Sequence, residues 1–411
     1  MFGFRRFFLL LALIGPAIIT SNIDNDAGGI AIYSIAGANY GYNMLWTLIP
    51  IVFLLIILQE MSSRTGIVTG KGLADLIREN YGVRTAFWVM VSLFITNLGN
   101  TAAEFSGWAA SMELFHISKY ISVPIGVFFV WFLVTKWNYS IFEKIFLGIC
   151  FIYGTYIVSA FLAKPDWSEV ARETVMPHIS WDANYLIMVV SIIGTSITPW
   201  QQFYLQSGVV EKGLHKENLW ASRIDVIFGS FMMGIVAFFI IVACGATLFP
   251  AGIGIDSAER AALSLKPLAG PNAYILFAIG LANASLFSGC ILPLATTYYI
   301  CEAMGWEMGI GKSFKEAPHF KFIFTTILAL GASVVLIPHL PLIKVMWFSQ
   351  IINCLLLPAV MIFMIQLIND DDIMGSYKNS LWMNIAAYIG TGVLILLNVV
   401  LLYNAFSGIF R

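Results

Sequence analysis

Two aspartates stand in the middle of an apolar run near the N-terminus. Asp24 and Asp26 lie within the stretch S-N-I-D-N-D-A-G-G at residues 21–29. If this run crosses a bilayer, each carboxylate costs at least about 2.5–3.5 kcal/mol unless water, a cation or a basic partner compensates it. No Lys or Arg lies in the interior of any apolar run of the chain. A bound cation or a hydrated cavity is therefore the simplest compensation.

Two glycines follow these aspartates and affect whether the aspartates can bind a ligand or only cap helices. Gly28 and Gly29 permit the helix to unwind and another element to approach closely. A structural alternative is that the aspartates only cap two half-helices through side-chain to backbone hydrogen bonds. For Asp24 both interpretations stay open, whereas for Asp26, which is followed by A-G-G, we favour a ligand role.

A second polar stretch, G-T-S-I-T-P-W-Q-Q at residues 194–202, interrupts a later apolar run. Thr195 and Thr198 precede Pro199, which lacks a backbone donor and leaves carbonyl oxygens upstream of it unpaired. With Gln201, the two stretches offer carboxylate, carbonyl, hydroxyl and amide oxygens. These hard ligands suit Mg²⁺, Ca²⁺ or Mn²⁺ better than soft metals. The alternative is a proline kink whose Ser and Thr side chains join neighbouring helices.

Composition decides what kind of protein holds these residues. Of 411 residues 59% are hydrophobic, 15% aromatic and only 11% charged, against roughly 25% charged in a soluble domain. The mean hydropathy is +0.84. These values exclude a soluble, a disordered or a nucleic-acid-binding protein and predict an all-α polytopic membrane protein. The five cysteines lie in apolar runs without C-x-x-C spacing, which indicates core residues rather than disulfides.

Apolar runs bounded by turns and charges predict eleven transmembrane helices. They cover residues 8–36, 43–62, 85–108, 118–136, 141–163, 184–207, 222–249, 271–302, 319–337, 341–368 and 381–403. The first run resembles a signal peptide, but it lacks a cleavage site and is expected to remain as part of helix 1. Most Lys and Arg residues fall in loops on the side of the N-terminus, which predicts that end inside and the C-terminus outside.

The two polar stretches predict a specific architecture. They break helices 1 and 6, which are five helices apart, and open backbone at mid-membrane depth survives only where it lines a cavity or is buried in protein. This pattern is typical of a five-plus-five inverted-repeat transporter fold. We therefore expect a first repeat over residues 1–163, a second over 164–368, and an additional helix 11 within 369–411.

Other polar residues in the apolar runs are weaker candidates. Gln350 and Asn353 in helix 10 either join the cavity or bond neighbouring helices. Glu104 in helix 3 is an intramembrane acid that we leave out of the predicted site. Ends of helices 2 and 7 carry residues that either form a gate network or reach individually to the membrane surface; these are Glu60, Arg64, Arg223 and Asp225. No histidine lies where a proton relay is needed, and no enzyme motif occurs in the sequence.

Several segments resemble the NRAMP family of divalent-metal transporters. The most specific is Q-E-M-S-S-R-T-G-I-V-T-G-K-G-L-A-D-L-I-R-E-N-Y-G at residues 59–82, which is similar to the family's segment joining helices 2 and 3. Further matches follow in order along the chain: G-P-A near Gly15, A-G-A-N-Y-G-Y at 36–42, F-E-K-I-F at 142–146, K-P-D-W-S-E-V at 164–170, L-F-A-I-G-L at 276–281 and S-Q with L-P at 349–358. The resemblance covers nearly all of the chain and implies the eleven-helix inverted-repeat fold.

The departures from the family pattern concern the metal site. Where the family has D-P-G-N in helix 1, this chain has Asp26-Ala27-Gly28-Gly29, so the aspartate stays and the asparagine ligand is absent. The family's M-P-H in helix 6 is replaced by Thr198-Pro199 followed by Trp and Gln, without a methionine ligand. The family's acidic pair in helix 3 corresponds to Asn97 and Asn100. The changes resemble the NRAMP-related magnesium transporter branch.

This resemblance implies a function and a site. We expect a multi-pass transporter in the plasma membrane of a prokaryote that imports Mg²⁺ and Mn²⁺ by alternating access without proton coupling. Loss of the thioether disfavours soft metals, and a roomy oxygen-lined cavity suits a partly hydrated Mg²⁺. The cation is substrate, no cofactor is expected, and the sequence is compatible with a monomer. The predicted metal-site residues are Asp26, Ile23, Asp24, Gly29, Thr195, Thr198, Gln201 and Gln350.

Three alternatives remain at this point. The first is a proton-coupled importer of transition metals of the ordinary NRAMP type. The second is an amino-acid carrier on the same fold, against which the two aspartates at the helix 1 break argue. The third is a metal sensor that binds Mg²⁺ without transporting it. An enzyme is the least favoured class because no catalytic motif is present.

Overall fold

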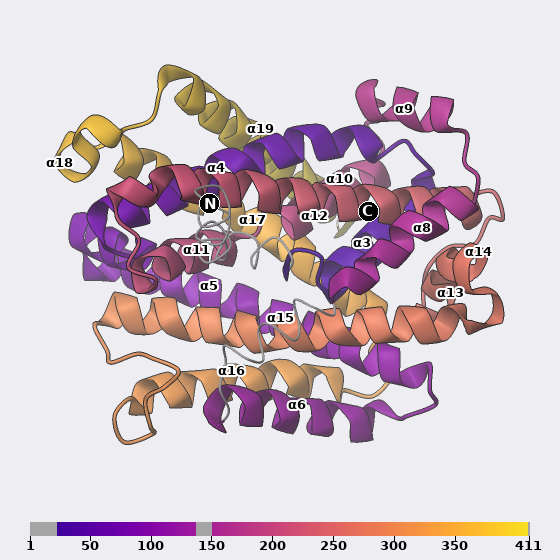
Figure 1. Cartoon of the computed structure of the whole chain (residues 1–411), viewed down its shortest axis with the longest axis horizontal. Coiled ribbons are helices and arrows are strands. Elements are labelled where there is room, and N and C mark those ends of the chain that lie inside the picture. The colour runs from indigo at the N-terminus through magenta and orange to yellow at the C-terminus, as the bar shows by residue number, and fades with distance from the viewer. Residues whose placement is uncertain (1–22, 137–149, 410–411) are drawn as a thin grey trace, which may run out of the picture.

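The computed structural model describes residues 23–136 and 150–409, which form a bundle of long helices joined by short loops (Figure 1). These described ranges contain no β-strand. Eight helical stretches within them are long and apolar enough to cross a membrane, and Lys119–Thr135 is a shorter apolar helix. The prediction of an all-helical polytopic membrane protein is confirmed.

The first part of the chain, up to the loop at residue 163, contains seven described helical segments. They are α3 (Ala27–Tyr40), η1 (Leu45–Thr47), α4 (Leu48–Thr69), α5 (Leu73–Glu113), α6 (Lys119–Lys136), η2 (Cys150–Tyr153) and α8 (Gly154–Leu162). The predicted segments 8–22 and 141–149 lie outside the described residues. The remaining predicted runs of this half each contain a helix.

The second half continues with a surface helix and a further set of long helices. They are α9 (Trp167–Val175), α10 (Ala183–Ser196), α11 (Pro199–Glu211), η3 (Lys216–Asn218), α12 (Leu219–Thr247), α13 (Ala258–Ala262), η4 (Leu263–Leu265), α14 (Lys266–Ala269), η5 (Gly270–Asn272), α15 (Ala273–Met304), α16 (Pro318–Val335), α17 (Leu342–Asn369), α18 (Asp371–Met374), η6 (Gly375–Tyr377) and α19 (Leu381–Ile409). Each predicted run from 184–207 onward is matched by one or two of these helices.

Two differences from the predicted boundaries have a physical cause. The helix predicted over 85–108 extends from Leu73 to Glu113, with a kink at Gly82 where φ is 83° and ψ is 163°. Only the part beyond the kink is strongly apolar, so hydropathy alone misses the first turns. Helix α9 is not among the predicted runs, because it mixes apolar and charged residues. It begins at Trp167 after the N-cap Asp166, whose side chain accepts hydrogen bonds from Ser168 N and Glu169 N.

The centre of the bundle is built around α5 and α3. Helix α5 packs along α15, α17 and α16, while α3 packs against α12 and α10. In Figure 1, α15 crosses the middle of the view, with α16 and α6 on one side and α4 and α12 on the other. Both α3 and α5 are thereby enclosed by other helices, which places the polar stretches of the sequence inside the protein.

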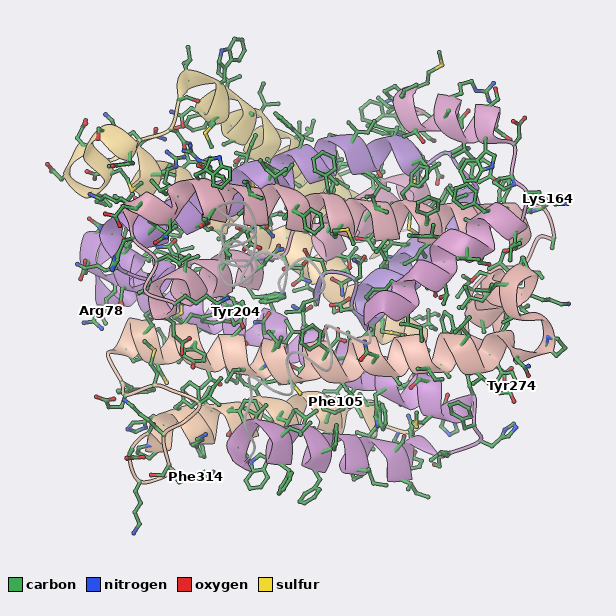
Figure 2. The ribbon with its side chains drawn as sticks, viewed as in Figure 1. Arg78, Phe105, Lys164, Tyr204, Tyr274 and Phe314 are labelled. Atoms are coloured by element: carbon green, nitrogen blue, oxygen red, sulfur yellow. The ribbon has the colours of Figure 1, made fainter. Side chains whose placement is uncertain are left out.

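Charged loops lie at the two ends of the bundle. In Figure 2, Arg78 lies at one end and Lys164 at the opposite end of the helices. The sequence predicts these two residues on opposite sides of the membrane, and their positions agree with that sorting. The outer helical faces carry many exposed apolar side chains, among them Phe53 on α4 and Phe231 on α12. Such a surface suits a lipid environment.

Helix α3 approaches α12 closely at Gly37. A Cβ atom added there would lie 2.5 Å from the carbonyl oxygen of Ile241 and 2.7 Å from the Cβ of Cys244. The backbone of α12 cannot rotate away as a side chain can. The contact therefore requires glycine for its size.

We predict that Gly37→Ala destabilises the protein by about 1–3 kcal/mol, as overpacking of a dense core does. Thermal unfolding of the purified protein in detergent measures the change. Gly99→Ala in α5 is the matched control, since no atom lies within 4 Å of its added Cβ. That variant should be as stable as wild type or slightly more stable. Equal unfolding temperatures for the two variants would contradict the packing argument.

Candidate functional site

The break in helix 1 falls at residues 24–26. Asp24 and Asn25 form a turn, and α3 begins at Ala27 with Asp26 as its N-cap. The Oδ1 atom of Asp26 accepts a hydrogen bond of 2.6 Å from the amide of Gly29. The capping alternative thus holds for one oxygen of Asp26. It does not hold for Asp24, whose side chain makes no such bond to the backbone within the described residues.

The two glycines of this stretch allow the close approach that the sequence predicts. Gly28 and Gly29 lie in the first turn of α3, and the open backbone lies just before them at residues 24–26. A Cβ on Gly29 would lie 2.5 Å from the carbonyl oxygen of Asp24 and 3.4 Å from Oγ1 of Thr195. The absence of a side chain thus brings the helix 6 break up against the helix 1 break.

The break in helix 6 lies at the predicted place. Helix α10 ends at Ser196, Ile197 and Thr198 are extended, and α11 begins at Pro199. Pro at the first position of α11 needs no hydrogen-bond acceptor, which makes it a favourable start for a half-helix. The interruption therefore opens two residues of backbone between two buried helices.

A side-chain hydrogen bond joins the two breaks. Nε2 of Gln201, on α11, donates to Oδ2 of Asp24 at 2.7 Å. Both residues are almost completely buried. This bond orients the Asp24 carboxylate toward helix 6, so Asp24 faces the same region as Thr195 and Gln201.

Gln350 contacts both breaks from α17. Its Nε2 atom lies where a Cβ of Gly28 would stand, at 1.9 Å, and its backbone oxygen lies 1.9 Å from the position of a Cβ on Gly194. Two glycines, one beside each break, thus let α17 pass between them. The Oε1 atom of Gln350 accepts a hydrogen bond of 2.9 Å from Asn353.

Around the two breaks several buried oxygen atoms lack a hydrogen-bond partner within the described residues. They are Asp24 Oδ1, Asn25 Oδ1, Glu104 Oε1, Thr195 Oγ1, Thr198 Oγ1 and Gln201 Oε1. A buried polar atom without a partner is costly, and native proteins rarely leave several of them in one place. A set made only of oxygens, two of them from carboxylates, has the chemistry of a hard-cation site.

Glu104 is the residue that the sequence reasoning missed. It lies on α5 and is 1% exposed, and its Oε2 atom accepts from the amide of Ala27 at 3.4 Å. Its carboxyl group is close enough to that of Asp26 for the two to share a hydrogen bond. The signal available in the sequence was the position of Glu104, an acidic residue within an apolar run.

The placement of Glu104 changes the premise that helix 3 brings no ionisable group to the site. Helix 3 still carries an ionisable group at the helix 1 break, although Asn97 and Asn100 are neutral. These two asparagines lie in a buried amide chain instead. Asn100 donates to Asn97 at 3.0 Å and to Asn353 at 2.9 Å, and Asn353 reaches Gln350. The chain connects α5 to α17 behind the site.

One thioether lies close to helix 6 without belonging to either break. The hydroxyl of Tyr33 forms a hydrogen bond of 2.8 Å with Ser196 Oγ, and it lies 3.7 Å from the sulfur of Met233 on α12. The thioether therefore contacts a tyrosine that stands between it and helix 6. Within the described residues no group of three or more His, Cys, Asp and Glu side chains is placed to hold a metal.

The structure thus gathers the predicted site residues at the two breaks. Asp24 and Gln201 are hydrogen-bonded, Gly29 adjoins Thr195, and Gln350 touches the Asp26 side at Gly28. The other predicted members complete the boundaries of the breaks. Ile23 is buried directly before the first break, and Thr198 is the N-cap of α11 without a side-chain capping bond.

Comparison with known proteins identifies the family. The family described as "Natural resistance-associated macrophage protein-like" matches residues 17–404. The chain belongs to the NRAMP family. It is a multi-pass membrane protein of a transporter family and not of an enzyme family. Membership of a magnesium-transporting branch rests on the resemblance alone.

Two curated relatives span nearly the whole chain. The "Divalent metal cation transporter MntH" of Verminephrobacter eiseniae is 25% identical over 414 residues, covering 97% of this chain and 90% of the relative. The protein of that name in Deinococcus radiodurans is 24% identical over 420 residues, covering 99% of this chain and 92% of the relative. Both matches therefore extend over nearly all of this chain.

Solved structures support the fold. A crystal structure of the Eremococcus coleocola manganese transporter superposes with a TM-score of 0.77 at 20% identity, covering 98% of this chain and 88% of that chain. The nucleobase-cation-symport-1 transporter Mhp1 gives a TM-score of 0.59 at 13% identity, covering 96% and 93%. The predicted inverted-repeat transporter fold is confirmed.

The contacts of Gln350 lead to a prediction about the two glycines that flank it. Gly194→Ala should destabilise the protein strongly, because its Cβ meets the backbone oxygen of Gln350. Gly28→Ala should cost less, because its Cβ meets the end of a side chain that can rotate away. Thermal unfolding in detergent ranks the two variants.

A second substitution distinguishes side-chain from backbone contact. Adding Gln350→Ala removes the atoms that meet Gly28→Ala and should recover much of its lost stability. The same addition should leave the Gly194→Ala defect in place. Recovery of both variants, or of neither, would show that α17 does not pass between the breaks as described.

Proposed function

We propose that this protein imports divalent cations, Mg²⁺ and also Mn²⁺, by alternating access at a site between the breaks of helices 1 and 6. The observation that carries the proposal is the group of buried oxygen atoms without hydrogen-bond partners, which includes Asp24 Oδ1, Thr195 Oγ1 and Gln201 Oε1. A divalent cation with part of its water shell would satisfy them together. The names of the MntH relatives support a divalent metal as substrate.

The kind of oxygen present supports Mg²⁺ in particular. Carboxylate, hydroxyl and amide oxygens are hard ligands, and Mg²⁺ keeps several of its waters when it binds. Gly29 adds no side chain where the family resemblance implies an asparagine ligand, and the carbonyl oxygen of Asp24 lies 2.5 Å from where its Cβ would stand, so this position presents a backbone oxygen instead. The thioether of Met233 contacts Tyr33 rather than the breaks. A soft transition metal would find no strong ligand in this set.

The broken helices supply the means of movement. Helices α3 and α11 start at the breaks as separate half-helices, and α10 ends there. In inverted-repeat transporters such half-helices move against the rest of the bundle around a fixed site. A plasma-membrane location would add the membrane potential, worth about 2.3 kcal/mol per charge per 100 mV, and a divalent ion experiences twice that. Import then needs no proton.

The first test is uptake of Mg²⁺ into proteoliposomes by wild type and Asp26→Ala. We expect uptake to fall by about tenfold or more, because the variant removes a charged ligand from a low-dielectric site. Asp182→Ala is a matched control, since Asp182 caps α10 with hydrogen bonds to Asn184 N and Tyr185 N at an exposed loop. If Asp26 only caps a helix, both variants would lose about 1 kcal/mol of stability and keep their uptake.

A second candidate function is favoured by the Glu104 carboxyl next to Asp26. Two buried carboxyl groups in contact can share a proton, and release of that proton would couple metal entry to proton entry. This is the proton-coupled NRAMP mechanism. The buried position of Glu104 between α5 and the start of α3 is the specific observation in its favour.

Internal pH during uptake separates the two mechanisms. For the uncoupled importer we expect Mg²⁺ entry driven by an inside-negative potential without acidification of the lumen. Glu104→Gln should then retain voltage-driven uptake, because the amide keeps the size of the side chain and can donate a hydrogen bond to Asp26. Acidification in wild type that disappears in Glu104→Gln would instead establish the coupled mechanism.

A further inference from the structure

A second polar region lies at the end of the bundle, away from the helix breaks. It surrounds a cavity of about 390 Å³ between α4, α12 and the segment that leads into α19. The lining consists of Ile56, Ile57, Glu60, Arg64, Arg223, Val226, Ile227, Lys378, Ser380 and Met383. The lining contains three basic side chains and one acidic side chain. Its excess of positive charge has no role in the proposed transport site.

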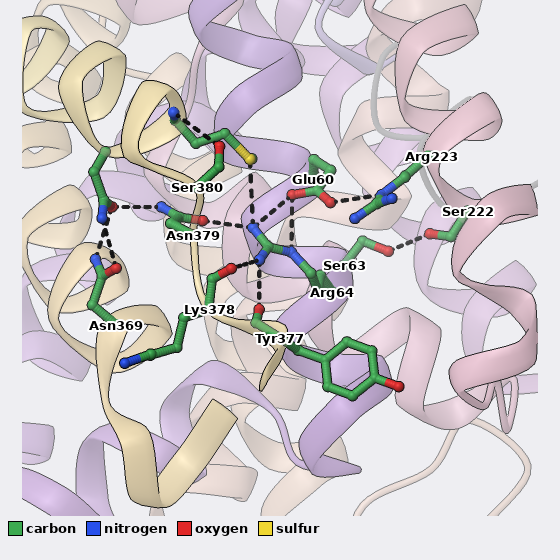
Figure 3. Close-up of polar contacts among 12 residues, drawn as sticks. Glu60, Ser63, Arg64, Ser222, Arg223, Asn369, Tyr377, Lys378, Asn379 and Ser380 are labelled. Atoms are coloured by element: carbon green, nitrogen blue, oxygen red, sulfur yellow. Dashed lines mark hydrogen bonds and ion pairs between the residues drawn. The ribbon is translucent and has the colours of Figure 1, made fainter. Parts of the chain in front are cut away.

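Arg64 is the fixed part of this region, as Figure 3 shows. Its side chain is 4% exposed and donates to Glu60 Oε2 at 2.9 Å. It also donates to the backbone oxygens of Tyr377 and Lys378 at 2.5 and 2.9 Å, and to Asn379 Oδ1 at 2.6 Å. These hydrogen bonds hold the segment before α19 against α4. Arg64 is therefore a structural anchor with little capacity for another ligand.

Arg223 differs from Arg64 because part of its guanidinium group has no partner among the described residues. Its Nε atom donates to Glu60 Oε1 at 2.9 Å, and its side chain is 53% exposed. Its two terminal nitrogens make no hydrogen bond to the part of the chain that the structure describes. A guanidinium whose planar fork faces outward suits the oxygens of a phosphate group. Glu60 orients this fork from behind.

The hydrogen bonds at this end of the bundle decide between the two arrangements that the sequence left open for Glu60, Arg64 and Arg223. Glu60, Arg64 and Arg223 were expected either to form a network or to reach individually to the membrane surface. They form a network, and the hydroxyls of Ser63 and Ser222 bond to each other one turn away on the same two helices. Asp225 is buried on α12 close by and has an interaction partner of its own.

The remaining walls of the cavity are apolar and lead toward the lipid-facing surface. Ile56 on α4 and Ile227 on α12 line it, and Ile227 is about half exposed. Next to Ile227 on α12, Phe228 and Phe231 are exposed on the outside of the bundle. The cavity thus has a basic rim at the ends of the helices and an apolar wall that continues along the membrane-spanning surface.

We propose that this cavity binds an anionic membrane phospholipid, with the phosphate group on the free nitrogens of Arg223 and the acyl chains against Ile56 and Ile227. Charge selects the ligand, because the lining carries more basic than acidic side chains and basic pockets between membrane helices hold anionic headgroups. Lys378, which pairs with the exposed carboxylate of Asp371 at 2.6 Å, adds positive charge at the rim. Lipid binding here would strengthen the contact between α4, α12 and α19.

Native mass spectrometry of the full chain in detergent tests the proposal. The protein is titrated with phosphatidylglycerol or phosphatidylcholine that have identical acyl chains. We expect preferential retention of phosphatidylglycerol by wild type and about fivefold weaker retention by Arg223→Gln, the effect of one basic residue near an anionic lipid. Arg172→Gln on α9 is the matched control, since Arg172 is 60% exposed and also paired with a glutamate, Glu173, but its Nη2 atom is bonded to that glutamate.

A second variant leaves every charge in place. Ile227→Trp fills the apolar wall and should also weaken retention of phosphatidylglycerol. The proposal is overturned if Arg223→Gln and Arg172→Gln retain phosphatidylglycerol equally, or if Ile227→Trp retains it as wild type does. It is also overturned if free glycerol phosphate displaces the lipid at equal concentration, because the ligand would then be a soluble phosphate. Unchanged unfolding temperatures of the variants confirm that they are folded.

Discussion

The burial of carboxylates among membrane helices is the constraint on which the rest of this structure depends. Asp24 and Asp26 are enclosed by other helices, and Glu104 joins them from α5. Charge in that position must be balanced by something other than bulk water. The open backbone of two broken helices and the oxygen atoms of α10, α11 and α17 surround the aspartates. The carboxylates thus lie where the backbone is open at the start of α3 and between α10 and α11.

Small residues make this arrangement possible. Gly29 lets helix 6 reach the turn at Asp24, Gly107 lets α5 reach Ala27, and Gly37 lets α3 lie on the backbone of α12. Without a hydrophobic driving force between helices in lipid, such close packing contributes much of the stability of a membrane bundle. The site and the core therefore depend on the same glycines, so substitutions intended to alter binding are prone to alter folding as well.

Hydropathy and polar interruptions predicted the all-helical membrane fold and the positions of the two breaks. These features depend on local sequence, because a bilayer demands long apolar runs and penalises polar residues within them. The position of Glu104 depends on how α5 packs against α3, and periodicity along one helix does not show which neighbour that helix meets. Close approach at Gly28 and Gly29 was predicted, but the sequence does not show that the neighbours are Gln350 of α17 and Thr195 of α10. The amphipathic helix α9 was not predicted because it lies outside the apolar runs.

The position of Gln350 has a mechanical consequence. One residue of α17 fits between glycines that flank both breaks, with its side chain toward Gly28 and its backbone toward Gly194. The two breaks therefore share one residue of α17 as a common neighbour. Any displacement of α17 at Gln350 changes the contacts at both breaks together, so the geometry of one break is linked to that of the other.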